Sequence, residues 1–332
     1  MKPQLPLLAL GALLAVGAQA GEFVYKDWAA ACDNTRHCEA VGYQNMEEGD
    51  PVTLWLARDA GGNAPVLGKL MVYADDVDDN ATLSIRAGEV LIKGIKQDMT
   101  AAQMARLLPA LKKADVARVT DGKREWLLSL SGLNAALLKI DDVQGRVGTL
   151  TALVRPGSKP ASAVPAALPA PALRAAPLLK QRDSDKALLP QLLDALKDAD
   201  CESIASEGAY GDVYRISDTQ LLVVRQCWLG AYQGAYGVWR VNDKPPYAPV
   251  RLMLPDADGK EQDSAVEAYF EDGVLSSYAK GRGINDCGSF NSWLWTADGF
   301  KLLESSSGPQ CRGMPGGGFM LRAWTAQQAK SS

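Results

Sequence analysis

A segment rich in proline and alanine, residues 156–184, divides the chain into two parts and limits how it can fold. A residue that precedes proline is kept out of the helical region of backbone conformation, so a continuous helix is not expected here. Such a composition predicts a semi-rigid, extended linker. The chain on either side is long enough for one domain. We therefore expect an N-terminal domain at 21–155, a C-terminal domain at 185–326 and a tail at 327–332.

The first twenty residues have the pattern of a secretory signal peptide. Lys2 supplies a positive charge, residues 5–16 are mostly apolar, and Ala18-Gln19-Ala20 is a small-x-small cleavage site. Cleavage there would start the mature chain at Gly21. No later segment reaches the run of about 18 apolar residues that a membrane span needs. We therefore expect residues 1–20 to be removed during export, with no membrane insertion afterwards.

The six cysteines take their meaning from the compartment that export implies. In an oxidising environment they predict structural disulfides, and the chain has no Cys-x-x-Cys redox pair and no paired short spacing for zinc. Cys32 and Cys38 precede the linker, so they pair with each other if bridges stay within domains. The other four can pair in more than one way. The pairings that we favour among them are Cys201–Cys227 and Cys287–Cys311.

Hairpin and helix signals alternate in the N-terminal part. Gly88 and the pair Asp121-Gly122 each lie between two runs of strand composition, which predicts two hairpins. A capping-box pattern at 100–103 opens a helix, and a second helix is expected after Ser131. The apolar stripes of both helices are typical of core packing.

The C-terminal part begins with a helix and continues as a β-rich domain. Ser184 can cap this helix, and Pro190 interrupts it early. Turn residues at 217–220, 272–273 and 298–299 each separate two strand-like runs, and three successive hairpins predict an antiparallel meander. The expected fold class is therefore α+β, with two disulfide-stapled domains that each consist mainly of antiparallel β-sheet with one or two helices.

Charge and histidine content exclude several function classes. Without Lys2 the chain has 34 basic residues (35 − 1) against 39 acidic ones, a net charge of −5. This balance does not favour a nucleic-acid partner. His37 is the only histidine, so a Ser-His-Asp triad or a multi-histidine zinc site would have to be built around it. No partner motif accompanies His37, and we interpret it as a polar loop residue.

Two acidic runs resemble calcium loops without completing the pattern. The run at 76–80 is followed by Ala81 where an EF-hand loop needs glycine, and the run at 256–263 lies where a hairpin turn is expected. The acidic cluster at 75–79 is the strongest local charge and is typical of a solvated loop. We therefore expect no metal site and no cofactor.

A small repeat of glycine, alanine and tyrosine at 230–237 suggests a ligand-contacting surface. With Trp228, Tyr232, Tyr236 and Trp239 it could present aromatic faces to a glycan or a peptide. The alternative is a bulged strand pair whose aromatic side chains pack inward. The sequence leaves both interpretations open.

The chain has no recognisable catalytic motif. The glycine-rich segments 281–288 and 311–318 lack the order of glycines that phosphate loops have, and we interpret them as disulfide-anchored turns. Neither a Gly-x-Ser-x-Gly elbow nor a Ser-x-x-Lys motif occurs. We therefore assign no catalytic residue.

Four sequence segments together resemble a known family. They are the Trp28-x-x-x-Cys32 start with its loop to Cys38, the Ser-Leu-Ser-Gly helix at 129–146, and the segments 281–288 and 311–313. The set resembles an exported proteobacterial family catalogued as domain of unknown function 1176, over nearly the whole mature chain. The N-terminal half is also weakly similar to invasion-associated locus B proteins of the bacterial envelope. The resemblance implies residence in the periplasm of a Gram-negative envelope and supplies no catalytic residues.

These observations favour a non-catalytic periplasmic protein that binds an unknown envelope protein or glycan. A flexible arrangement of two domains would suit the bridging of two partners. One alternative is an envelope-glycan hydrolase with paired carboxylates, for which Asp286 and Glu267 are candidates although nothing in the sequence pairs them. Another alternative is a periplasmic lysozyme inhibitor.

Overall fold

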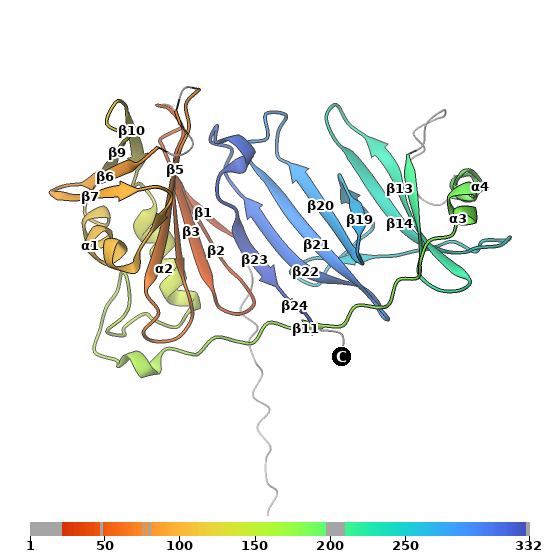
Figure 1. The fold of residues 1–332 in the computed structure, drawn as a ribbon. Helices are drawn as coiled ribbons and strands as arrows, with labels where there is room; N and C mark the ends of the chain where they lie inside the picture. Colours follow the sequence, from red (N-terminus) through yellow and green to blue (C-terminus); the bar gives the residue numbers. More distant parts are fainter. Residues whose placement is uncertain (1–21, 47–48, 76, 79–80, 197–209, 330–332) are drawn as a thin grey trace, which may run out of the picture.

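The computed structural model describes residues 22–46, 49–75, 77–78, 81–196 and 210–329. The expected α+β class is confirmed: two parts, each built mainly from antiparallel sheet with few helices, lie next to each other (Figure 1). The predicted signal peptide lies outside the described residues. Within those ranges, no helix is long and apolar enough to cross a membrane.

The N-terminal part contains a six-stranded and a four-stranded sheet, both antiparallel, with two helices. The six-stranded sheet has the order β1 (Phe23–Tyr25), β2 (Trp28–Cys32), β3 (Cys38–Tyr43), β4 (Val52–Arg58), β5 (Val66–Val72) and β8 (Asp98–Met99). The four-stranded sheet has the order β10 (Glu125–Ser129), β9 (Val116–Thr120), β6 (Leu83–Ala87) and β7 (Val90–Ile95). The helices are α1 (Ala101–Leu111) and α2 (Leu133–Val143).

One apolar core joins these N-terminal elements. Trp28 and Trp126 come from different sheets and are both almost fully buried in it. Met104 and Leu107 of α1 pack into the same core, as the predicted apolar stripe requires. The capping box at 100–103 is present, since the Thr100 hydroxyl accepts a hydrogen bond from the Gln103 amide at 3.2 Å.

The C-terminal part contains two five-stranded antiparallel sheets and a small hairpin. One sheet runs β12 (Gly211–Arg215), β13 (Gln220–Leu229), β14 (Gly234–Asn242) and β15 (Val250–Arg251), with β18 (Ala265–Val266) also paired to β14. The other sheet runs β19 (Tyr269–Glu271), β20 (Val274–Lys280), β21 (Gly288–Thr296), β22 (Gly299–Gly308) and β23 (Leu321–Thr325). The small hairpin consists of β16 (Leu254–Pro255) and β17 (Glu261–Gln262).

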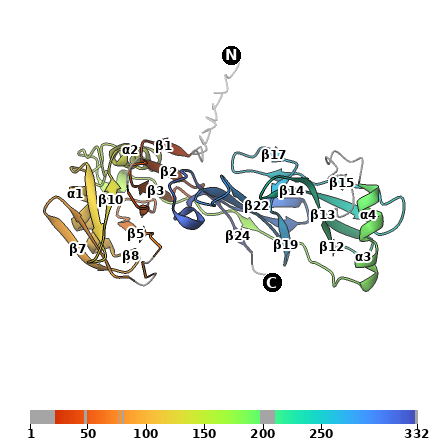
Figure 2. The same ribbon diagram turned by 90° about the horizontal axis from the view of Figure 1, so that it is seen from above.

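The sheet of β12–β15 is packed on both faces. Trp293, Trp295 and Phe270 of the other sheet pack with one face of it. Leu192 and Leu196 pack on the opposite face, where the helices α3 (Asp183–Ala187) and α4 (Leu189–Ala195) lie (Figure 2). The break between these two helices lies next to Pro190, the residue expected to interrupt the helix.

The disulfides join residues within each part. Cys32 pairs with Cys38, and Cys287 pairs with Cys311, as the sequence predicts. Cys227 is also disulfide-bonded. The expected pairing with Cys201 lies outside the described residues.

The Pro- and Ala-rich linker is extended and is docked along its length. It is the light green coil that runs along one edge of the molecule in Figure 1. The Leu168 amide donates to Thr35 in the N-terminal part at 3.1 Å, and the Ala176 amide donates to Trp295 in the C-terminal part at 2.9 Å. In between, β11 (Ala172–Leu173) forms a parallel pair with β24 (Gln327–Gln328). The linker is therefore extended, as its composition predicts, and its contacts with both parts oppose the flexible arrangement of two domains suggested above.

Candidate functional site

The two parts of the molecule meet in a buried contact. β2 and β3 lie against β23, which is the edge strand of the C-terminal sheet (Figure 1). An apolar cluster fills this contact, and Leu321 of β23 is fully buried in it. The N-terminal residues of the cluster are Ala29, Ala31, Val41 and Tyr43, with Trp55 and Phe319 packed at its margin.

Arg312 fixes the loop that follows β22 to the N-terminal part. Its guanidinium pairs with the Asp27 carboxylate at 3.0 Å and donates to the carbonyls of Lys26 and Gln44 at 3.2 Å each. Gln44 returns a hydrogen bond to the Arg312 carbonyl at 2.6 Å, and Gln310 accepts from Arg312 Nε at 2.7 Å. Because Arg312 is buried, these polar contacts exchange little with water and hold the loop in one position.

A disulfide and a carboxylate hold the same loop from the other side. Cys311 is bonded to Cys287. The neighbouring Asp286 accepts from the Gly313 amide at 2.6 Å and from Arg282 Nε at 2.6 Å. The hydrogen bonds from Arg282 lower the pKa of Asp286 below its ordinary value, against the opposing effect of burial. The segment 311–318 is therefore a turn anchored at its start, as expected.

The anchored loop places Met314 over the N-terminal sheet. The loop continues as the single turn η2 (Pro315–Gly317) and then turns at Gly318, whose φ is +66°. A β-carbon at Gly318 would lie 2.9 Å from Cγ of Met314, so this position requires glycine. Met314 is almost completely buried.

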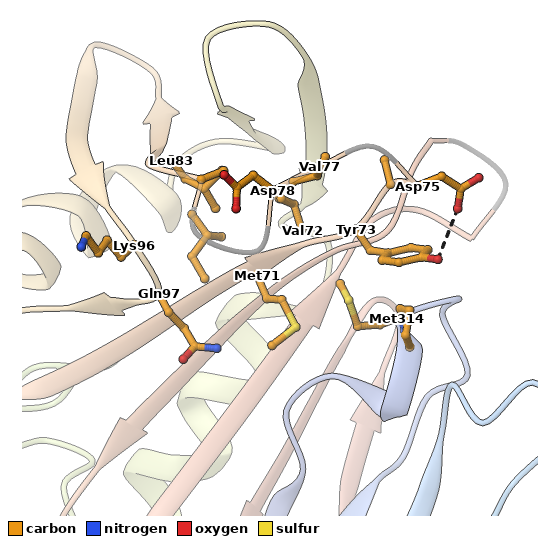
Figure 3. A pocket seen from close by; sticks show the side chains of 14 residues that line it. Met71, Val72, Tyr73, Asp75, Val77, Asp78, Leu83, Lys96, Gln97 and Met314 are labelled. Atoms are coloured by element: carbon orange, nitrogen blue, oxygen red, sulfur yellow. Dashed lines mark hydrogen bonds between the residues drawn. The ribbon is translucent and has the colours of Figure 1, made fainter.

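A cavity of about 780 Å³ opens between this loop and the end of β5. Its apolar lining includes Met71 and Val72 of β5, Leu83 of β6 and Met314 (Figure 3). A volume of this size lies in the range of small-molecule and peptide sites. Both parts of the molecule contribute to the lining: most of it comes from the N-terminal part, and Met314 and Pro315 of the C-terminal part complete it.

Charged groups of both signs line the cavity. Asp75 contributes a carboxylate on one side, beside Tyr73, whereas Asp78 contributes a carboxylate and Lys96 an ammonium group on the other side in Figure 3. The Tyr73 hydroxyl donates to Asp75 at 3.3 Å, and Gln97 adds an amide. The cavity can therefore hold a ligand with an apolar middle and a positive group at one end.

A smaller cavity of about 300 Å³ continues from the first. The two share Tyr73, Ala74 and Asp75, and the second extends to Asp50 and Arg124. The open space at the junction is therefore a groove along the end of β5 rather than a closed pocket.

The structure places part of the acidic cluster in this site. Asp75 and Asp78 are exposed and line the larger cavity. The other residues of the predicted calcium-like run, Asp76, Asp79 and Asn80, lie outside the described residues. In the second calcium-like run, Asp256 accepts from the amides of Asp258 and Lys260, as a hairpin turn requires.

The four aromatic residues proposed as ligand contacts do not form one surface. Trp239 is 1% exposed and packs in the core, with Arg251 over its ring. Tyr236 is half-buried beside the other core of this part. Trp228 and Tyr232 are each 48% exposed near the turn between β13 and β14. Only these two remain available to a ligand from solvent.

The single histidine lies between two carboxylates. His37 Nε2 is 3.1 Å from Glu39, and Nδ1 is 2.6 Å from Asp59. Burial lowers the pKa of His37, but the hydrogen bonds to Glu39 and Asp59 raise it by more, so the pKa lies above its ordinary value. The second oxygen of Glu39 accepts from the Arg322 amide in β23 at 2.7 Å, so His37 is linked to the contact between the two parts.

The two carboxylates considered for hydrolysis have structural roles. Asp286 is held by Arg282 and Gly313, and its lowered pKa is opposite to the raised value that a general acid needs. Glu267 accepts from the Gly234 amide at 2.5 Å. Asp286 also lies close to the sulfurs of Cys287 and Cys311, but these are bonded to each other and are not thiolate ligands.

Sequence reasoning missed Met71, Lys96, Gln97 and Met314, which line the cavity. Each lies in a segment that is unremarkable by itself, and Met314 comes from the far end of the chain. The only local signal was the disulfide-anchored glycine-rich turn at 311–318.

Comparisons with known proteins name relatives without naming an activity. The family model described as "Protein of unknown function (DUF1176)" matches residues 22–327. The uncharacterized protein YpfG of Escherichia coli (strain K12) is 29% identical over 322 residues, which cover 89% of this chain and 90% of that protein. No solved structure matches the chain.

Proposed function

Since this chain belongs to the DUF1176 family, whose description states no reaction, we propose that the protein is a non-catalytic binding protein of the periplasm. Its ligand occupies the cavity between the end of β5 and the loop that carries Met314. The signal-like residues 1–20 and the oxidised cysteines support the location. The weak similarity of the N-terminal half to invasion-associated locus B proteins agrees with an envelope protein.

One observation carries this proposal: the cavity is formed by both parts of the molecule and has an apolar lining with charges at its sides. Binding sites in proteins commonly lie at the contact between domains and combine apolar walls with a few polar groups. The carboxylate pair suggested for a hydrolase has no support in the contacts of Asp286 and Glu267. No contact described here favours a lysozyme inhibitor.

The test compares a blocked cavity with an unblocked one. Gln97 is exposed and lines the cavity, so Gln97→Trp adds bulk at the cavity wall at small cost to folding. Lys93→Trp adds the same side chain at an exposed position of β7 outside the cavity. We expect immobilised oxidised wild-type protein and Lys93→Trp to retain the same component of a periplasmic extract, and Gln97→Trp to lose it. Equal retention by all three proteins, or none above a blank support, contradicts the proposal.

A further inference from the structure

The cavity contains a length of open strand edge at the end of β5. β8 pairs with β5 only at Gly68 and Lys69. Among the described residues, the last hydrogen bond on this side is made by the Leu70 amide, which donates to the Gln97 carbonyl at 2.9 Å. Just before Gln97 in the sequence, the chain belongs to β7, which pairs with β6 in the other sheet. No described strand pairs with Val72 on the side away from β4.

The backbone groups of Val72 point toward this open side. The Tyr73 amide donates to the Pro51 carbonyl at 2.8 Å, so it points toward the side of the strand that faces β4. The Leu70 amide donates in the opposite direction. Backbone groups alternate in direction along a strand, so the N–H and C=O of Val72 point the same way as those of Leu70. They offer one donor and one acceptor at the spacing of a strand edge.

The residues around this edge favour a ligand of a particular charge as well as one of extended shape. Met71 and Leu83 provide apolar contact for side chains. Asp75 lies beyond the end of the strand beside the Tyr73 hydroxyl, whereas Asp78 lies by Leu83, on the side of the cavity toward Lys96 (Figure 3). A bound chain that runs along the edge and past its end would therefore meet the Asp75 carboxylate there.

We propose that the cavity binds an extended peptide, which adds a short strand to the edge of β5 at Val72. A lysine or arginine side chain of the peptide pairs with Asp75. This inference rests on the proposed function and adds the chemical class of the ligand. Main-chain hydrogen bonds hold such peptides, and pockets for individual side chains give them specificity. A glycan uses neither the strand edge nor the apolar lining in this way.

The first experiment uses synthetic peptides. The probe is a mixture of capped hexapeptides that contain one lysine and otherwise valine, threonine and leucine. Titration calorimetry should detect binding of the mixture. Replacing the lysine by glutamate should weaken binding at least about tenfold, because the ligand then meets Asp75 with like charge. N-methylation of alternate amides should weaken it at least as much, because it removes main-chain donors and keeps the side chains.

The second experiment changes the protein. Val72→Pro removes the outward N–H, and proline is tolerated at an edge position whose N–H is outside the ladder. Val72→Thr is the matched control, which keeps this N–H. We expect Val72→Pro to weaken binding of the peptide mixture at least about tenfold and Val72→Thr less than about threefold. In the wild type, the peptides should slow hydrogen exchange at the Val72 amide.

The outcomes separate the two proposals. If no peptide binds although Gln97→Trp abolishes retention from the extract, the cavity is a binding site and the peptide inference is wrong. If the N-methylated peptides or Val72→Pro bind as well as their unmodified counterparts, strand addition is excluded. If neither the peptides nor the extract give cavity-dependent binding, the proposed function fails as well.

Discussion

At the scale of single residues, His37 makes the stability of the protein depend on pH. It hydrogen-bonds Glu39 and Asp59, and its pKa in the folded protein is raised. The stabilisation is therefore fully present below the unfolded pKa of about 6.5 and is lost as the pH rises through the folded value. Because His37 is the only histidine in the chain, no other imidazole contributes to the change in stability over this pH range.

We expect the free energy of unfolding to fall as the pH rises from about 6 to about 8.5. His37→Gln should flatten this dependence, because glutamine keeps a polar side chain and carries no titrating charge. Urea unfolding at a series of pH values measures the effect. The proton signals of the single imidazole give its pKa directly, and a value below about 6.5 would contradict the structure.

Arg312 should contribute far more to the free energy of unfolding than an exposed arginine does. It is buried and pairs with Asp27, so Arg312→Gln leaves that carboxylate without its cation. We expect a loss of about 3 kcal/mol in the free energy of unfolding. Arg36 also donates to a carbonyl, that of Ala166, but through an exposed contact, so Arg36→Gln should cost less than about 1 kcal/mol. Urea unfolding at pH 7 compares them, and similar losses would show that Arg312 does not anchor the contact.

At the scale of elements, the two disulfides whose cysteines are both described provide a matched comparison. Cys287–Cys311 closes a sequence separation of 24 residues, and Cys32–Cys38 closes one of 6. On chain entropy alone, removing the first should cost roughly 3.5 kcal/mol and the second roughly 2.4 kcal/mol.

Removal of one or the other disulfide should differ more in its effect on ligand retention than in its effect on stability. Cys287–Cys311 anchors the loop that carries Met314, whereas Cys32–Cys38 lies outside the cavity lining. Changing both cysteines of the first pair to alanine should therefore reduce retention from a periplasmic extract while the protein is still folded. The same change at Cys32 and Cys38 should leave retention intact. The reverse order would show that the loop does not form the site.

Elements with local signals could be predicted from the sequence. The capping box at 100–103 marks the start of α1, and Asp121-Gly122 forms a turn in which Gly122 has a φ of +93°. β2 could not be predicted in this way. Its sequence, Trp-Ala-Ala-Ala-Cys, is buried at every position because its sheet is covered on both faces. A strand buried on both faces has no alternation to recognise.

The candidate site was beyond sequence reasoning for a different reason. Asp75 was visible as part of a charge cluster, but a cavity needs walls, and its walls come from segments that only the fold brings together. Met71 lies in an N-terminal strand and Met314 in a loop that follows β22. No periodicity links two segments so far apart in the chain.

At the scale of the whole molecule, the two parts form one assembly through surface contact as well as through the linker. The apolar cluster around Leu321 spans both parts, and Arg322 pairs with Asp33 at 2.7 Å. Asn34 and Thr325 exchange two hydrogen bonds, at 2.9 and 3.0 Å. A buried contact of this kind opposes independent motion of domains.

Cutting the linker tests whether the contact or the covalent connection holds the parts together. A protease site inserted after Pro169 lies in an exposed stretch, and neither described disulfide crosses it. We expect the two pieces of the cut protein to elute together in size-exclusion chromatography at micromolar concentration, and to keep binding the extract component. Leu321→Asp buries a charge in the shared cluster, so the cut variant should separate into two pieces. Circular dichroism of the uncut variant checks that its sheets persist. If the cut wild type separates as well, the linker alone holds the parts, and a cavity with walls from both of them could not keep its shape.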